Sequence, residues 1–317
     1  MKLSVETQDS VNNSKIFELF LPAIVKHLAF SGCHFMPDKL KLARCLGMFF
    51  HYAFYLQKKA LDNNSFSEPP NCIYDPTEKG HFSNLAGKAI ADFLSKRISN
   101  AIFTVNYEAA MKATRLSIKE KRPDLLAISQ KGVFAIEAKG LSKKPTDEKI
   151  KEFEDQSLQG MLPVDFCVTS VSYNLYSKVK CKYHENLPIS NNNNNNVQEI
   201  LRNLSKNYYL NFLNFISDNS QFKATEELGK EKFYKIDLFN EHLEKGLIEY
   251  PLGVWLKKFL DFYKPKLIIP ENIKYYAENG LSLTPFEFEG NDEIYIDNDR
   301  IGIELNNKKE SFYLELC

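Results

Sequence analysis

Apolar residues recur at helical spacing over the first part of the chain, from 14 to about 61. Pro22 and Pro37 stand where a helix would begin or bend, so the pattern predicts two or three packed helices. The polar run DNNSFSEPPNC at 62–72 then interrupts any regular element. We therefore expect residues 1–74 to form a helical N-terminal region.

The pattern changes after this boundary to helix, three strands, helix and strand. A continuous apolar stripe at i, i+3, i+4 spacing predicts a helix over 78–98, and the run Asp75-Pro76-Thr77-Glu78 before it is typical of a capped helix start. The remaining elements are expected as strands at 101–107, 122–129 and 133–139, a helix at about 147–160 and a strand at 164–172. The order αβββαβ thus defines a predicted core over 75–187.

The last part of the chain begins with the asparagine run 191–196, which cannot supply a packed face and predicts an exposed loop. Beyond it we expect a C-terminal helical segment ending in a small β-meander over 197–317. Its predicted helices lie near 197–217 and 238–262, and its alternating strand-like runs at 282–288, 292–297, 301–305 and 311–316. The predicted fold class is α+β.

Composition narrows the class of protein further. The chain has 317 residues, 44% of them hydrophobic, which excludes intrinsic disorder. Its six cysteines are dispersed without a CxxC pair, and its N-terminus lacks the pattern of a signal peptide, so we expect reduced thiols and a cytoplasmic location. The longest apolar stretches are interrupted by charges or too short to span a bilayer, which predicts no membrane partner.

Candidate chemistry lies on the two strands predicted to form a hairpin around the tight turn Gln130-Lys131-Gly132. Because side chains alternate along a strand, Glu137 and Lys139 share one face. A pairing sum near 262 places Asp124 across from Ala138, and a modest bulge or twist then brings Asp124 beside Glu137. Two carboxylates and one ammonium group would converge at the end of an otherwise apolar strand pair.

This combination suits phosphodiester hydrolysis, in which negative charge grows on the phosphate. Mg²⁺ prefers hard oxygen ligands from one or two carboxylates, with water and phosphate in the rest of its shell. Asp124 and Glu137 fit that role, with the carbonyl of Ala138 as a third candidate ligand, and Mn²⁺ is expected to substitute. Lys139 could orient the attacking water or steady the charge on the phosphate. The plainer interpretation of the same residues is a solvated hairpin end with an ordinary charge pair.

The runs Arg122-Pro123-Asp124 and Glu137-Ala138-Lys139, each on its own apolar strand, resemble the signature of the PD-(D/E)XK nuclease superfamily. The predicted αβββαβ order resembles the core of that family, the restriction-endonuclease-like fold, over roughly 76–175. The resemblance implies Mg²⁺-dependent cleavage of nucleic acid, with Asp124 and Glu137 as metal ligands and Lys139 as the catalytic lysine.

The resemblance also implies two further kinds of site residue. Many members add an acid from the first core helix, for which Glu78 is the candidate, although a capping role at the helix start is an equal alternative. Some members use a glutamine from the helix after the motif, which Gln156 or Gln159 could supply, although both are also ordinary helix-surface amides. Glu108, after the first strand, is a further candidate acid.

Charge is unevenly spread along the chain, although its 41 basic and 41 acidic residues cancel. Residues 111–151, which contain the motif, hold 11 basic and 5 acidic side chains, whereas 284–317 hold 3 and 9. The basic section predicts contacts with nucleic-acid phosphates. The candidate binding residues are Lys112, Arg115, Lys119, Lys121, Arg122, Lys143 and Lys144. The acidic C-terminus is hypothesised to cover this basic face or to repel nucleic acid from a wrong approach.

The sequence therefore predicts a metal-dependent endodeoxyribonuclease, with a restriction or anti-phage role by analogy alone. An RNase or a repair or recombination nuclease on the same core is one alternative. Another is a non-catalytic nucleic-acid-binding subunit that works with a helicase or methyltransferase partner. Cleavage of both strands by one site per chain would call for a homodimer.

Overall fold

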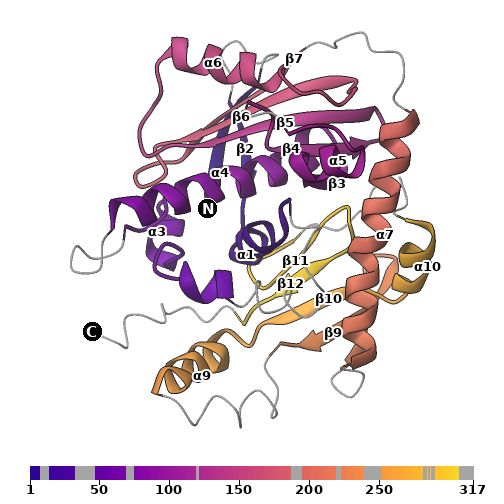
Figure 1. The fold of residues 1–317 in the computed structure, drawn as a ribbon. Coiled ribbons are helices and arrows are strands. Elements are labelled where there is room, and N and C mark those ends of the chain that lie inside the picture. The colour runs from indigo at the N-terminus through magenta and orange to yellow at the C-terminus, as the bar shows by residue number, and fades with distance from the viewer. Residues whose placement is uncertain are drawn as a thin grey trace.

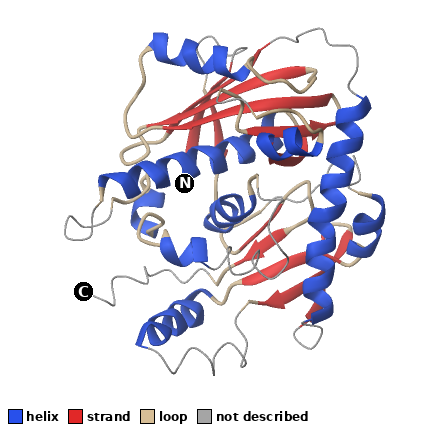
Figure 2. Cartoon of the chain, viewed as in Figure 1, coloured by secondary structure: helices blue, strands red, loops and turns tan. Residues whose placement is uncertain are grey.

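The structure is a computed structural model that describes residues 1–7, 14–32, 47–68, 75–118, 121–186, 195–218, 223–238, 251–280, 284, 286 and 290–306. Over these residues the chain is an α+β protein with a curled, mixed seven-stranded sheet and an antiparallel five-stranded sheet (Figures 1 and 2). In this described part of the chain, no helix combines the length and the apolar character needed to cross a membrane.

The large sheet has the strand order β2-β1-β7-β6-β5-β4-β3. Its strands are β1 (Lys2–Thr7), β2 (Lys15–Glu18), β3 (Ala101–Asn106), β4 (Leu125–Ser129), β5 (Gly132–Gly140), β6 (Phe166–Tyr173) and β7 (Lys180–Asn186). Strands β3, β4 and β5 form an antiparallel meander, and β6 then runs parallel to β5. The three expected strands and the fourth after the second helix are confirmed to within three residues at each end. Strand β7 was not predicted.

The N-terminal region is not the purely helical unit that the pattern predicted. Strands β1 and β2 pair with each other, and β1 pairs in parallel with β7, so the chain start belongs to the large sheet. Leu3 and Val5 are fully buried between more exposed neighbours, which is the alternation of a strand. The expected helices are found at α1 (Leu21–Phe30), at residues 47–51 and at α3 (Lys58–Asp62). Pro37 lies outside the described residues.

Two helices pack on opposite faces of the large sheet, α6 (Asp147–Ser157) on one face and α4 (Pro76–Ile98) on the other (Figure 1). Both were predicted. Helix α4 begins where the sequence indicates, because the side chain of Asp75 accepts a hydrogen bond from the backbone N–H of Thr77 at 2.7 Å. The short helix α5 (Tyr107–Ala113), which follows β3, was not predicted. The predicted order αβββαβ is present, with α5 inserted into it.

The C-terminal part is more extensive than the predicted helical segment with a terminal meander. Helix α7 (Asn195–Asp218) is confirmed and runs beside both sheets (Figure 1). The five-stranded sheet has the order β11-β12-β10-β9-β8. Its elements are β8 (Lys223–Leu228), β9 (Glu231–Asp237), β10 (Lys266–Pro270), β11 (Ile294–Ile296) and β12 (Gly302–Glu304), with α10 (Ile273–Asn279) after β10. The two described runs of the meander, β11 and β12, therefore form one edge of a larger sheet.

Some expectations for this part fall on undescribed residues. The helix predicted at 238–262 corresponds to α9 (Pro251–Tyr263) over its second half. Residues 239–250 of the predicted helix lie outside the described part. The strand-like run 311–316 and most of 282–288 lie outside it as well, as does most of the asparagine run.

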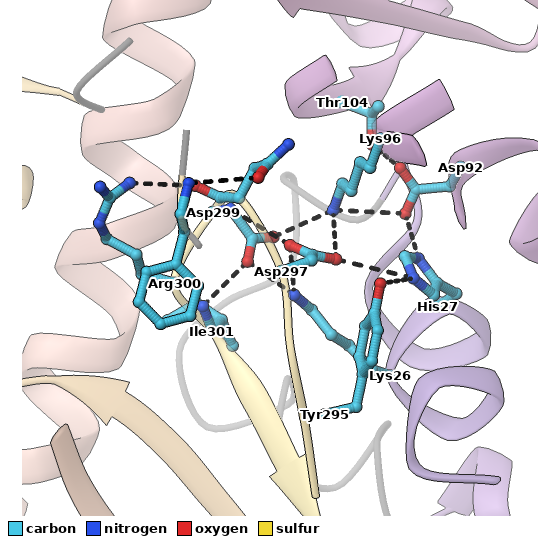
Figure 3. Close-up of polar contacts among 12 residues, drawn as sticks. Lys26, His27, Asp92, Lys96, Thr104, Tyr295, Asp297, Asp299, Arg300 and Ile301 are labelled. Carbon is cyan, nitrogen blue, oxygen red and sulfur yellow. Dashed lines mark hydrogen bonds and ion pairs between the residues drawn. The ribbon is translucent and has the colours of Figure 1, made fainter. Parts of the chain in front are cut away.

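A cluster of buried charges joins α1, α4 and the β11–β12 turn (Figure 3). We call it the buried charge cluster; its members are Lys26, His27, Asp92, Lys96, Asp297 and Asp299, each at most 7% exposed. The Nζ atom of Lys26 lies 2.7 Å from carboxylate oxygens of both Asp297 and Asp299. Lys96 reaches Asp297 at 2.9 Å, and His27 Nδ1 lies 2.8 Å from Asp92. These contacts tie the five-stranded sheet to the helix that packs on the large sheet.

The cluster changes the hypothesis for the acidic C-terminus. Asp297 and Asp299 neutralise lysines of α1 and α4, and Glu304 pairs with Lys266 at 3.1 Å and also with Lys235. The three acids are therefore engaged with the protein interior and the small sheet, not with the basic section around residues 111–151. Glu287 and Glu289 lie outside the described residues, while Asp292 and Glu293 are exposed.

Candidate active site

The β4–β5 hairpin brings Asp124 to the level of Glu137. Ser129 pairs with Gly132 and Leu125 with Ile136, so the pairing sum is 261 where 262 was predicted, and the paired residues end at Leu125. The reason is the turn: Gly132 has a φ of 129° and already belongs to the strand, which leaves a two-residue loop. Asp124 lies in a bend just before β4, and its N–H donates to the carbonyl of Ile136, the residue that also pairs with Leu125, so the chain departs from the regular register at this point.

Backbone contacts hold Asp124 at the start of β4. Its N–H donates to the carbonyl of Ile136 at 2.9 Å, and its own carbonyl accepts from the N–H of Tyr107 at 3.0 Å. Its side-chain Oδ2 accepts from the N–H of Ala138 at 3.1 Å. The other oxygen, Oδ1, interacts with a cationic group, the ammonium group of Lys88 described below. The side chain of Asp124 is 29% exposed.

Glu137 is a fully buried carboxylate, with 0% of its surface exposed. Neither of its oxygens has a hydrogen-bond donor in suitable geometry within the described residues, although Oε1 forms an ion pair with Lys139. Burial raises the pKa of Glu137 to about 8 and the nearby Asp124 adds to the rise, while Lys139 and Lys88 oppose it. A buried acid whose pKa is raised this far by burial is typical of a functional position.

Two lysines complete the set. Lys139 is 25% exposed and lies on the face of β5 that α6 covers, with its Nζ 5.4 Å from the centre of the Phe153 ring. Lys88 reaches from α4 and places its Nζ 3.2 Å from Asp124 Oδ1. Each carboxylate of the site thus has one ammonium group beside it.

Lys88 is the residue that the sequence interpretation missed. It stands at the margin of the apolar stripe of α4, three residues after Leu85, where a lysine is ordinarily a solvated edge residue. Only the crossing of α4 over the sheet shows which strand end it meets. The signal in the sequence is its half-buried helix position, and that signal is weak.

The helical candidates are placed less favourably. Gln156 lies near the site, but its Nε2 donates to the backbone carbonyl of Arg122 at 3.3 Å, so it supports the segment that leads into Asp124. The backbone N–H of Gln159 donates to the carbonyl of Gln156 at 3.1 Å, in the turn that ends α6. Glu78 lies in the first turn of α4, ten residues or about 15 Å along the axis from Lys88. The structure therefore does not bring Glu78 together with Asp124 and Glu137.

Glu108 and two of the predicted nucleic-acid-binding residues form an ion-pair group at the edge of the site. Glu108 lies 2.7 Å from Lys112 and is also paired with Arg122. These two contacts lower the pKa of the Glu108 carboxyl. Lys112 and Arg122 thus share their charge with an acid of the protein.

The other candidate binding residues flank the motif. Lys121 precedes Asp124 and is exposed, and Lys143 and Lys144 are exposed directly after the end of β5. Arg115 is exposed at the end of α5, while Lys119 lies outside the described residues. Lysines thus stand on both chain segments that lead to and from the paired carboxylates.

The donor set can be tested for its fit to Mg²⁺. Glu137 offers a buried carboxylate whose Oε2 has no partner within the described residues, and Asp124 offers Oδ1. Ala138 is 8% exposed and its carbonyl is the third candidate ligand. Across the described part of the chain, no three His, Cys, Asp or Glu side chains gather in a metal-binding group. Two carboxylates and a carbonyl match a hydrated Mg²⁺, which keeps several water ligands.

Comparison of the chain with protein-family models, with curated proteins and with solved structures found no match in any of the three. The assignment of a function therefore depends on the geometry of the site.

Proposed function

We propose that this protein is a Mg²⁺-dependent endodeoxyribonuclease with a restriction-endonuclease-like core. The observation that carries the proposal is the meeting of Asp124, Glu137 and Lys139 at the open end of the β4–β5 hairpin. There the buried Glu137 carboxylate has the Lys139 ammonium group beside it and, within the described residues, no hydrogen-bond donor in suitable geometry. The order α4-β3-α5-β4-β5-α6-β6 around these residues supports it, since this order, without the inserted α5, accompanies the motif in the family that the sequence resembles.

Each side chain of the site has its own role in the proposed hydrolysis. Asp124 and Glu137 would hold Mg²⁺ with the carbonyl of Ala138, and the bound ion would supply charge neutralisation for the phosphate and a more acidic water. Lys139, a quarter exposed and next to Glu137, orients the attacking water or stabilises charge on the phosphate oxygens. The exposed Lys143 and Lys144 meet the flanking phosphates.

The test is cleavage by the full chain of duplex DNA, single-stranded DNA, branched DNA and RNA, each with Mg²⁺, Mn²⁺ or EDTA. We expect cleavage of DNA with Mg²⁺ or Mn²⁺ and none with EDTA. Asp124→Asn, Glu137→Gln and Lys139→Met should each reduce the rate at least about a hundredfold. Lys149→Met is the matched control, because Lys149 is an exposed lysine of α6 paired with Glu152. Equal rates in the Glu137→Gln protein and the wild type would refute the assignment.

A second candidate is a nucleic-acid-binding subunit that retains the fold without turnover. The observation that favours it is the complete burial of Glu137, which leaves no exposed surface on one of the two proposed ligands. DNA binding that is equal with Mg²⁺ and with EDTA, together with no cleavage of any substrate, would select this candidate. A helicase or methyltransferase partner and a role in defence are proposals that rest on this same assay.

A further inference from the structure

The Lys88–Asp124 contact bears on how the proposed site takes up its metal, and the inference drawn from it rests on the proposed function. Asp124 has one oxygen, Oδ2, engaged by the N–H of Ala138. The other oxygen, Oδ1, lies 3.2 Å from Lys88 Nζ. The ammonium group of Lys88 therefore occupies a position beside Asp124 Oδ1 where a metal ion could otherwise bind.

The site already holds two ammonium groups without a metal. Two carboxylates, Asp124 and Glu137, face two ammonium groups, Lys88 and Lys139. A divalent cation brought into this arrangement meets two positive groups within a few ångströms, and Coulomb repulsion weakens its binding. Lys88 comes from a different element and its side chain is 25% exposed, so it borders solvent, whereas Oδ2 is held by the backbone of β5.

We propose that Lys88 is an internal competitor for Mg²⁺ and that nucleic acid removes the competition. A backbone phosphate at the site offers Lys88 an alternative anion, which releases Asp124 Oδ1 for the metal. Metal and nucleic acid then bind cooperatively, and the coupling is reciprocal. In the absence of nucleic acid the site holds Mg²⁺ weakly, so loading is confined to the enzyme–substrate complex. Lys88 acts here through Asp124 as a positioning residue.

The geometry of α4 supports a specific role for Lys88 in preference to a general surface charge. Ser83 and Gly87, on the same helix, approach the backbone of Gly140 at the end of β5. That close approach fixes α4 against the strand that carries Glu137 and Lys139. The ammonium group of Lys88 is thereby delivered to the site by a rigid element and is not placed by a flexible loop.

The experiment measures Mn²⁺ binding to the full chain by electron paramagnetic resonance, with and without a DNA duplex that carries non-cleavable phosphate linkages. Wild type, Lys88→Met and Lys88→Arg are compared. The matched control is Lys79→Met, which removes a lysine of the same helix that pairs with Glu68 at 2.7 Å, away from the site. The readout does not depend on turnover.

We expect Lys88→Met without DNA to bind Mn²⁺ at least about tenfold more tightly than wild type, because a unit charge beside a divalent ion is worth this much even in water. Lys88→Arg should keep the weak binding, and DNA should tighten Mn²⁺ binding to the wild type but much less to Lys88→Met. Unchanged or weaker Mn²⁺ binding by Lys88→Met would overturn the inference.

The outcome separates this inference from the proposed function. If the wild type binds Mn²⁺ and cleaves DNA while Lys88→Met binds the ion no more tightly, the inference fails and the proposed function stands. If neither protein binds Mn²⁺, with or without DNA, both fail together. Circular dichroism of the variants establishes that each is folded as the wild type is.

Discussion

A β-carbon on Gly87 of α4 would lie 2.3 Å from the backbone nitrogen of Gly140 in β5. One on Gly140 would lie 1.8 Å from the carbonyl oxygen of Ser83. Both distances are shorter than any tolerable contact, so the helix and the strand touch through their backbones at this point. The contact lies directly after Lys139 and directly before Lys88, and it therefore sets the distance between the two elements that build the site.

Substitution of Gly87 by alanine is expected to separate α4 from β5. The added methyl group meets backbone atoms that cannot move aside, so the free energy of unfolding should fall by at least about 2 kcal/mol. The measurement is urea unfolding followed by circular dichroism. Gly80→Ala is the matched control on the same helix, because nothing lies within 4 Å of the added carbon there. That variant should gain about 0.5–1 kcal/mol from the helix preference of alanine. Equal stability of the two variants would contradict the close contact.

Replacement of Glu137 by glutamine is expected to abolish the stabilisation of the protein by Mg²⁺ and to increase the stability of the metal-free protein. Burial disfavours the charged form of Glu137 and Lys139 offsets this only in part, so a neutral amide of the same shape should raise the metal-free free energy of unfolding by about 1 kcal/mol. Thermal unfolding of the wild type should shift upward with Mg²⁺ and return with EDTA, since a ligand stabilises the state that binds it. The variant should show no Mg²⁺ shift.

The matched control for that experiment is Glu152→Gln, because the side chain of Glu152 on α6 is 62% exposed. It should behave as the wild type does in both respects. A Mg²⁺ shift that persists in the Glu137 variant would mean that the ion binds elsewhere.

Loss of one lysine from the buried charge cluster is expected to be strongly destabilising. Lys96→Met leaves Asp297 and Asp299 buried with a single lysine, and removal of one member of a buried ion pair costs about 3–5 kcal/mol. Lys274→Met removes an exposed lysine 4.0 Å from Glu278 and should cost less than about 0.5 kcal/mol. Guanidinium unfolding of both variants measures the difference. A cost below about 1 kcal/mol for Lys96→Met would show that the cluster is open to solvent.

The stability of the protein should fall in mildly acidic solution through His27. Burial lowers the pKa of His27 below its ordinary value of 6.5, although Asp92 and Asp297 oppose the shift and Lys96 reinforces it. Its second nitrogen lies 3.2 Å from the Tyr295 hydroxyl, so both ring nitrogens face buried groups. At His27 the unfolded chain therefore binds more protons than the folded chain as the pH drops through 6.5, and the contribution of this residue to the free energy of unfolding decreases.

The check is the free energy of unfolding of wild type and His27→Gln between about pH 8 and pH 5. As the pH falls below 6.5 the wild type should lose stability relative to His27→Gln, because the opposite contribution of Glu137, whose pKa is raised to about 8, is present in both proteins. Asp92 contributes a further loss only in stronger acid, because its pKa lies below 3.8: burial would raise it, but Lys96 and His27 lower it. Parallel pH profiles for the two proteins would contradict the role of His27.

Local features of the sequence determined the elements around the site. The run from Asp75 to Glu78 and the apolar stripe after it gave α4 its start and its buried face, because caps and helical periodicity depend on residues within a few positions of each other. The alternation along β5 placed Glu137 and Lys139 on one face for the same reason. The pairing sum of the β4–β5 hairpin was predicted as 262, whereas the structure has 261. The torsion angle of Gly132 decides whether the loop has two residues or three.

Tertiary structure alone decided what meets the site and what holds it. Lys26 and Asp299 are 273 positions apart, and no spacing rule relates them. Strand β1 pairs with β7, whose backbone groups would otherwise be unpaired on that side of the sheet. The alternating pattern of a short strand does not indicate which strand it will pair with. Lys88 reaches Asp124 because Gly87 lets α4 cross β5 at contact distance. Side-chain chemistry and periodicity are local properties of a chain, whereas such crossings follow from the packing of the whole fold.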